Sequence, residues 1–154
     1  MLLAALACAP RSAGELDAAH AAAMRDSVVG FATTIARHLS EDGPVAWLRY
    51  FETSPAFFMA SDGQVVFRSS DSATVLVEGL ARTVAALNLE WVELRVEPLA
   101  PGLAVVGASY RESITDTAGV IMEFGGFMTA VARHTPDGWR LRNLHWSSPI
   151  PPPH

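Results

Sequence analysis

The sequence predicts one α+β domain, in which helices cover one face of a strongly curved, mostly antiparallel sheet. Helical patterns are confined to the first half of the chain, and everything after Asn88 alternates in the manner of β-strands. The long strand patterns contain Gly107, Gly125 and Gly126, and a glycine inside a strand commonly marks a bulge or a sharp bend. We therefore expect a cone-shaped sheet with an open mouth, wrapped on a long N-terminal helix and accompanied by two further helices.

Three helices are predicted in the first half of the chain. The first covers residues 16–39, where apolar residues recur at steps of three to five positions. Gly43-Pro44 ends this pattern, and a proline there suits the first turn of a short second helix over residues 45–52. The run Ser69-Ser70-Asp71 offers N-caps for a third helix, whose apolar positions extend over residues 75–87.

The strands are predicted as one short hairpin followed by a four-stranded meander. The hairpin joins residues 56–60 and 64–68 through the turn Ser61-Asp62-Gly63. Turn signals separate the longer strands, which are expected over residues 90–99, 103–114, 120–134 and 138–148.

Composition excludes several classes of protein. Half of the 154 residues are apolar and 18% are charged, which is typical of one globular domain. The net charge of −5 is spread along the chain without a basic stripe, so nucleic acid is not an expected partner. A single cysteine excludes an internal disulfide, and the five histidines lack the spacing of metal ligands. We expect no metal and no cofactor.

The ends of the chain are expected to lie outside the domain. Residues 1–15 begin with an apolar run that ends in Ala7-Cys8 and look like the remnant of a bacterial lipoprotein signal, with Cys8 as the lipidated residue. That interpretation places the protein outside the cytoplasm, in the periplasm or anchored to a membrane through Cys8 alone; the alternative is a disordered N-terminus of a cytoplasmic protein. The domain then covers residues 16–148, and residues 149–154 form a proline-rich tail.

The last strand carries the most informative pattern, because Asn143, His145 and Ser147 share one face with Leu141. If Pro136-Asp137-Gly138 is a three-residue loop, Thr129 pairs with His145 and Phe127 with Ser147. A two-residue loop would instead bring Met128 and Ala130 to that position. Consecutive polar groups in so apolar a chain indicate the lining of a cavity. One expected wall of this cavity combines an aromatic residue with four hydrogen-bonding groups, namely Phe127, Thr129, Asn143, His145 and Ser147. This polar wall faces an expected aromatic wall on the helix side, formed by Trp47, Tyr50, Phe57 and Phe58.

The element order resembles the nuclear transport factor 2-like superfamily, and within it the SnoaL-like branch. The residues that carry the resemblance are Trp47-Leu48-Arg49-Tyr50-Phe51, Ala56-Phe57-Phe58, Asp62-Gly63, Leu103-Ala104-Val105-Val106-Gly107, Pro136-Asp137-Gly138-Trp139-Arg140-Leu141 and Asn143-Leu144-His145-Trp146-Ser147. The last run is similar to a His-x-His-x-Ser run of that branch, with Asn143 in place of the first histidine. The resemblance covers about residues 16–148 and implies the cone fold, which hosts isomerases, cyclases, dehydratases, carriers and assembly domains.

Two groups of residues are candidates for chemistry. His145 is the imidazole expected to face the cavity, where it would move a proton near neutral pH. The alternative is that it contacts a ligand, or is held by Thr129 or Asn143 and orients the sheet without chemistry. Glu112 and Tyr110 share a face of one strand, where a desolvated Glu112 would act as a base and Tyr110 as a donor. The alternative is that Glu112 lies near a strand end and is solvated.

Trp91 and Trp146 are expected on the sheet face opposite the core, since simple alternation places them there. Exposed indoles on an open sheet indicate a homodimer interface. The leading functional hypothesis is a domain that binds a small apolar or aromatic molecule in a cavity with a polar floor. The alternatives are an acid–base isomerase, cyclase or dehydratase that uses His145, and a dimeric interaction domain without a ligand; whether the chain is an enzyme stays open.

Overall fold

The computed structural model describes residues 16–149, and it begins with a long helix. Helix α1 spans Ala18–Asp42, and the Asp17 side chain caps its start by accepting a hydrogen bond from the His20 amide at 2.8 Å. Its end falls at Gly43, whose φ of 71° lies in the left-handed region that glycine enters without strain. The 3₁₀ helix η1 follows over Pro44–Arg49, where the sequence predicted a longer α-helix.

The remaining elements are one further helix and six strands. They are β1 (Phe58–Ser61), β2 (Gln64–Phe67), α2 (Ser70–Ala81), β3 (Val84–Ala100), β4 (Leu103–Asp116), β5 (Ile121–Thr135) and β6 (Gly138–Ser147). Ser69 caps α2 through the Ser72 amide, as the sequence predicted. The predicted extension of this helix to Leu87 is wrong, because Val84 to Leu87 already pair with Asp116 to Ile114 at the end of β4.

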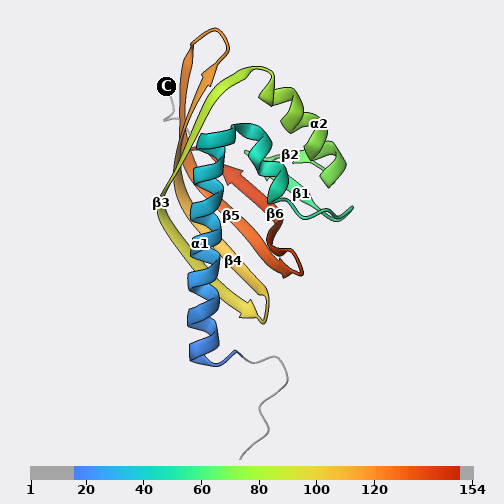
Figure 1. Ribbon diagram of the computed structural model, residues 1–154, viewed down its shortest axis with the longest axis vertical. Coiled ribbons are helices and arrows are strands. Elements are labelled where there is room, and N and C mark those ends of the chain that lie inside the picture. Colours follow the sequence, from blue (N-terminus) through green and yellow to red (C-terminus); the bar gives the residue numbers. More distant parts are fainter. Residues whose placement is uncertain (1–15, 150–154) are drawn as a thin grey trace, which may run out of the picture.

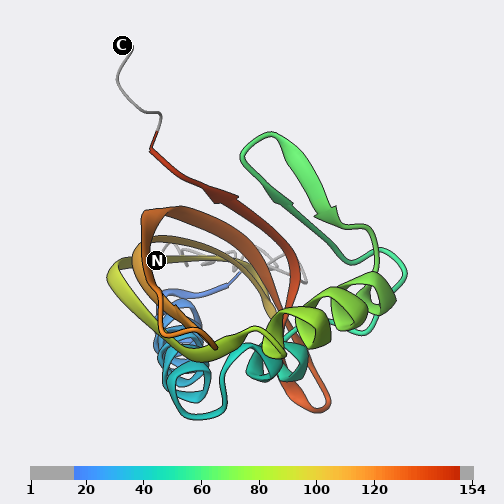
Figure 2. The same ribbon diagram turned by 90° about the horizontal axis from the view of Figure 1, so that it is seen from above.

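The strands form one open sheet in the order β2-β1-β6-β5-β4-β3. All neighbours are antiparallel except β1 and β6, which run parallel. In Figure 1, α1 lies along one face of the sheet while α2 and the β1–β2 hairpin stand beside it. Figure 2 shows the strands curling around α1. The predicted α+β cone is confirmed.

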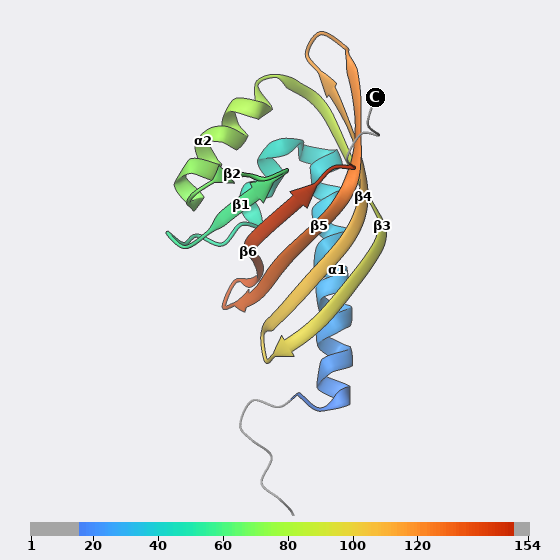
Figure 3. The same ribbon diagram turned by 180° about the vertical axis from the view of Figure 1, so that it is seen from behind.

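The two faces of the sheet differ in what covers them. The inner face packs against α1 through the buried side chains of Val28, Ile35 and Leu39. Trp91 and Trp139 fix the helix further, since their indole N–H groups donate to the Ala32 carbonyl at 2.8 Å and the Ser27 hydroxyl at 2.9 Å. The outer face carries no helix among the described residues, and Figure 3 shows its strands uncovered.

Two β-bulges decide which side chains reach the inner face. Val92 is an extra residue opposite β4, because Trp91 pairs with Tyr110 and Glu93 with Ser109. Arg142 is an extra residue opposite β5, because Leu141 pairs with Ala132 and Asn143 with Val131. After each bulge the alternation restarts one position later, so the side chains at even-numbered positions turn inward in place of those at odd-numbered positions.

The second bulge also explains a pairing that the sequence predicted. The last hairpin has the two-residue loop Pro136-Asp137, since Thr135 pairs with Gly138. That loop alone would move the register by one position. The bulge at Arg142 moves it back, so the predicted pairing of Thr129 with His145 is confirmed.

Candidate ligand-binding cavity

A cavity of about 370 Å³ lies between the inner face of the sheet, helix α2 and the β1–β2 hairpin. This volume is near the lower end of the range for small-molecule sites. Its walls are mostly apolar, with Leu76, Val77 and Leu80 contributed by α2. Six aromatic side chains also line it: Trp47, Phe51, Phe67, Tyr110, Phe124 and Trp146.

Several of these aromatic side chains pack against one another, with Trp146 in contact with both Tyr110 and Trp47. The ring of Tyr110 lies 4.7 Å from that of Trp146 at an interplanar angle of 89°. The ring of Trp47 lies 5.9 Å from it at 85°, and Trp47 in turn stacks on Phe51 at 5.6 Å. Edge-to-face pairs of this kind hold their partners in fixed orientations. The cavity therefore has a preformed aromatic corner.

Asp62 marks the polar rim of the cavity. The β1–β2 turn places Asp62 (φ 48°) and Gly63 (φ 83°) in left-handed conformations, as in the Asp-Gly turns that close tight hairpins. The Asp62 carboxylate accepts hydrogen bonds from the Ser148 amide at 2.7 Å and the Ser148 hydroxyl at 3.2 Å. The hydrogen bond from the Ser148 amide is the main reason why the pKa of Asp62 lies below its ordinary value, so this carboxylate is ionised at neutral pH.

Glu112 has the opposite electrostatic setting. It lines the cavity from β4 beside Phe124, its pairing partner on β5. Burial raises the pKa of its carboxyl above the ordinary value, and no described residue forms a hydrogen bond or an ion pair with it. Burial also raises the pKa of Tyr110, and the negative charges of Glu112 and Asp62 raise it further. Tyr110 is thus influenced by two carboxyl groups whose pKa values are displaced in opposite directions.

Three of the predicted site residues line this cavity: Trp47, Tyr110 and Glu112. The expectation that Glu112 is solvated at a strand end does not fit its partly buried position and raised pKa. Phe57 is fully buried, and its ring packs 4.8 Å from that of Phe51 behind the cavity wall.

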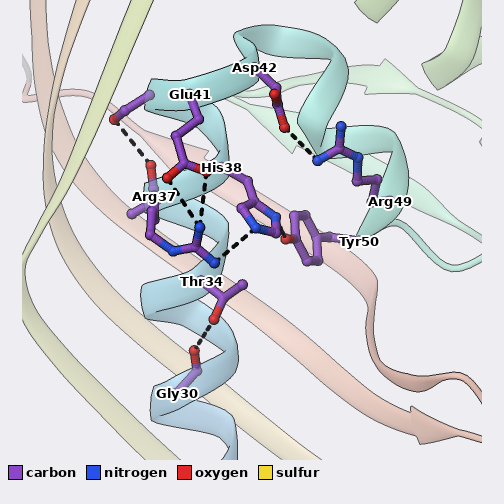
Figure 4. A network of polar contacts seen from close by, with 10 residues as sticks. Gly30, Thr34, Arg37, His38, Glu41, Asp42, Arg49 and Tyr50 are labelled. Atoms are coloured by element: carbon purple, nitrogen blue, oxygen red, sulfur yellow. Dashed lines mark hydrogen bonds and ion pairs between the residues drawn. The ribbon is translucent and has the colours of Figure 1, made fainter.

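Tyr50 is held in a separate polar network on α1, shown in Figure 4. Arg37 donates to Nε2 of His38 at 2.9 Å, so that nitrogen carries no proton and the Nδ1–H group faces the Tyr50 hydroxyl. Arg37 also pairs with Glu41 at 2.9 Å. Burial raises the pKa of Tyr50. The expectation that Tyr50 closes the cavity is therefore wrong, because its ring points toward α1.

The remaining predicted residues lie on the outer face, so the predicted polar cavity wall is wrong. Phe58, Thr129, Asn143 and His145 do come together, around a shallow depression of about 180 Å³ on that face. Thr129 and His145 are exposed there. The bulge at Arg142 is the cause, because it turns Leu144 and Trp146 inward in place of Asn143 and His145.

Phe127 and Ser147 share this outward orientation. Phe127 is 46% exposed, and its ring covers Gly107 on the neighbouring strand, 3.6 Å from where a Cβ would lie. The Ser147 hydroxyl donates to the Phe127 carbonyl at 3.3 Å. Neither residue lines the cavity.

The tryptophans predicted on the outer face lie on the inner face. Trp91 packs on α1, and its ring stacks on that of Trp146 at a centroid distance of 6.1 Å. The bulge at Val92 explains why Trp91 turns inward together with Leu94 and Val96, while Val92 is exposed. Because both indoles lie on the inner face, the expectation that they form a dimer interface is wrong.

Sequence reasoning missed Asp62 and most of the apolar lining. Asp62 was assigned only to a turn, where an aspartate is usually solvated. The position of Phe124 could have been inferred from its pairing with Glu112. The contribution of α2 depends on tertiary packing and has no signal in the sequence.

Some expectations fall outside the described residues. Cys8 and the rest of residues 1–15 lie there, as does the tail from residue 150 onward. Within residues 16–149, no helix has the length and apolar character needed to span a membrane. The same part of the chain contains no cluster of three or more side chains able to hold a metal ion.

Comparison with known proteins identifies the fold. Neither a family model nor a curated protein matches the chain. Among solved structures, a nuclear transport factor 2-like superfamily protein from Salmonella enterica has a TM-score of 0.65 at 15% identity, with 84% of this chain and 90% of that chain covered. A candidate scytalone dehydratase from Novosphingobium aromaticivorans has a TM-score of 0.70 at 9% identity, covering 81% and 83%. A candidate dehydratase of the same fold family from Streptomyces avermitilis has a TM-score of 0.70 at 14% identity, covering 84% and 98%.

These similarities confirm the nuclear transport factor 2-like fold that the sequence resemblance predicted. The fold is one that accommodates ligand binding and dehydratase-type or isomerase-type chemistry. At such low identities the comparisons establish the fold alone.

Proposed function

We propose that this chain binds a small, largely apolar molecule in the cavity, with the polar group of that molecule against Tyr110, Glu112 and Asp62. The observation that carries the proposal is Glu112, a carboxyl group in an apolar cavity that no described residue hydrogen-bonds or neutralises. Such a group costs free energy in the empty protein. A ligand that supplies the missing partner offsets that cost and gains affinity from it.

The shape of the cavity supports the same proposal. Its aromatic corner and the aliphatic side chains of α2 provide apolar surface, while its polar groups gather around Glu112 and Asp62. This division is typical of sites that bury the body of a ligand and orient it through a few polar contacts. An interaction domain without a ligand would be expected to fill this space with side chains.

The proposal is tested by titrating the chain with indole-3-ethanol, an uncharged aromatic alcohol, in a calorimeter. Leu80→Trp places an indole in the cavity, whereas Val75→Trp adds the same group at a 74% exposed position of the same helix that does not line the cavity. We expect Leu80→Trp to weaken binding by roughly tenfold or more and Val75→Trp to leave it unchanged. Equal effects of the two substitutions, or no binding to the unmodified chain, would contradict the proposal.

An acid–base enzyme of the isomerase, cyclase or dehydratase type is the second candidate. The opposite displacement of the Glu112 and Asp62 pKa values favours it, since such pairs divide the roles of acid and base. In this version Asp62 accepts a proton and Glu112 donates one, and the exposed His145 takes no part. Deuterium exchange at the α-carbon of 2-tetralone, followed by NMR, tests it. Exchange should require Glu112 and Asp62 but survive His145→Gln; exchange no faster than in buffer would remove this candidate.

A homodimer and export from the cytoplasm remain part of the proposal. The uncovered outer face, with Phe58 and Phe127 each 46% exposed, supports a second copy of this chain as its partner. Lipid anchoring rests on the Ala7-Cys8 pattern alone. Anchoring is tested by expressing the full chain and its Cys8→Ser variant in a bacterium. Only the chain that keeps Cys8 should be recovered with the membranes.

A further inference from the structure

The lining of the cavity contains acidic groups and aromatic rings but no basic side chain. Among residues 16–149, Asp62 and Glu112 are the two carboxyl groups that line it, and no arginine, lysine or histidine of that range does so. An anionic ligand would therefore meet negative charge without any compensating cation. Asp62, which is exposed at the rim and bonded to Ser148, adds a second negative charge on that side of the cavity.

The aromatic corner has the geometry of a site for a positive charge. Trp47, Tyr110 and Trp146 all line the cavity, and the ring planes of Trp47 and Tyr110 are nearly perpendicular to that of Trp146, at 85° and 89°. A cation placed over the face of an aromatic ring is attracted by the negative potential of that face, and tryptophan is the strongest partner. The parts of these rings that line the cavity therefore offer an attractive surface to an ammonium group bound there.

We propose that the ligand of this cavity is an organic ammonium ion, an amine with an apolar ring-sized body, held between the Trp47–Trp146–Tyr110 corner and the Glu112 carboxylate, with Asp62 at the rim. This inference rests on the proposed binding function and names the chemical class of its ligand. The apolar body lies against Phe124 and the α2 side chains, and the ammonium group supplies the partner that Glu112 lacks.

The protonation of Glu112 gives amine binding a pH dependence that can be measured. The ionisable groups that face it are Tyr110 on its own strand and Asp62 on the β1–β2 turn, while α2, β5 and β6 contribute only apolar residues and Ser148 around it. Burial favours the neutral form of Glu112 in the empty cavity, whereas an ammonium ion favours the carboxylate. Wherever part of Glu112 is protonated, binding of an amine therefore releases a proton from it, and the affinity falls as pH is lowered through the raised pKa of this group.

The experiment compares three probes that share one ring system: tryptamine, indole-3-ethanol and indole-3-acetate, which carry a cationic, a neutral and an anionic head group. Each is titrated calorimetrically into the full chain at neutral pH, in two buffers that differ in ionisation enthalpy. We expect tryptamine to bind roughly tenfold or more tightly than indole-3-ethanol, and indole-3-acetate to bind most weakly. Repeated at mildly acidic pH, where the raised pKa leaves part of Glu112 protonated, the titrations should show proton release with tryptamine alone.

Glu112→Gln and Glu97→Gln form the matched pair of variants. Both remove one carboxyl group from the long strands, but Glu97 is exposed on the outer face of β3. Glu112→Gln should cost tryptamine roughly tenfold in affinity and change indole-3-ethanol by less than about threefold, whereas Glu97→Gln should change neither. Stronger binding of the alcohol than of the amine, or an amine preference that survives Glu112→Gln, would overturn the inference. Absence of all binding would instead refute the proposed function.

Discussion

The segment that carries Trp47 and Phe51 to the cavity is fastened to the sheet by backbone hydrogen bonds and by the ion pair of Glu52 with Arg133, and removal of that ion pair gives a sharp prediction. Glu52 is 5% exposed, and its carboxylate accepts hydrogen bonds from Nε of Arg133 at 3.2 Å and from Nη2 of the same side chain. Arg142 lies 3.8 Å away. The backbone amide of Glu52 also donates to the Leu141 carbonyl at 2.8 Å.

The expected decrease in the free energy of unfolding for Glu52→Gln depends on the burial of the two partners, which is unequal. Breaking a fully buried ion pair costs about 3–5 kcal/mol, because the remaining charge is left without a partner. The Arg133 side chain is 44% exposed and can return to water, which reduces the loss to about 1–3 kcal/mol. A domain of this size changes its melting temperature by about 3 °C for each kcal/mol, so a fall of about 3–9 °C is expected.

Urea unfolding of the two proteins, followed by tryptophan fluorescence, measures this difference. Glu93→Gln is the matched control, because Glu93 forms an ion pair of 2.7 Å with Arg95 in which both side chains are more than half exposed. Exposed pairs contribute little, so the control should lose less than about 1 kcal/mol. The reasoning is refuted if Glu52→Gln is no more destabilising than Glu93→Gln.

Three further predictions concern other parts of the domain. Glu112→Gln should raise the melting temperature at about pH 8 and not at about pH 4, because the raised pKa of Glu112 destabilises the folded state only as pH rises above the ordinary value; an equal change at both values would contradict this. Gly126→Ala should destabilise strongly, since its Cβ would overlap the Ser147 carbonyl oxygen, and thermal melting with a cost below about 1 kcal/mol would show that β6 moves aside freely. Thr129→Arg should dissociate the proposed homodimer by adding charge to the outer face beside His145, as judged by analytical ultracentrifugation; an unmodified chain that is already monomeric would refute the dimer.

The sequence predicted the α+β class and most element positions because those depend on local patterns. The Asp62-Gly63 turn, the Ser69 cap and the break at Gly43-Pro44 are all set by residues next to each other in the chain. The resemblance to the nuclear transport factor 2-like fold added the arrangement of these elements in space.

The faces of the strands could not be predicted in the same way. A strand's alternation fixes its faces only while the pairing is unbroken, and one extra residue reverses every position beyond it. Val92 and Arg142 are such residues, and neither is a glycine or a proline that would announce a bulge. His145 was therefore assigned to the cavity and Trp146 to the outer face, and the structure exchanges them.

Glu112 and Tyr110 were placed together correctly because no bulge separates them on β4. Asp62 reaches the same cavity from a turn about fifty residues earlier in the chain, through its bonds to Ser148. No local pattern encodes that approach. It results from the parallel pairing of β1 with β6, which sequence reasoning did not predict.

A crystal structure of the chain in complex with indole-3-ethanol shows directly whether the cavity binds a ligand and whether Glu112 contacts its polar group. We expect electron density for the indole ring inside the cavity, between Trp146 and Leu80, with the hydroxyl group within hydrogen-bonding distance of Glu112. Density confined to the outer-face depression beside His145, or a cavity that the ligand occupies with its hydroxyl turned away from Glu112, Tyr110 and Asp62, would contradict it.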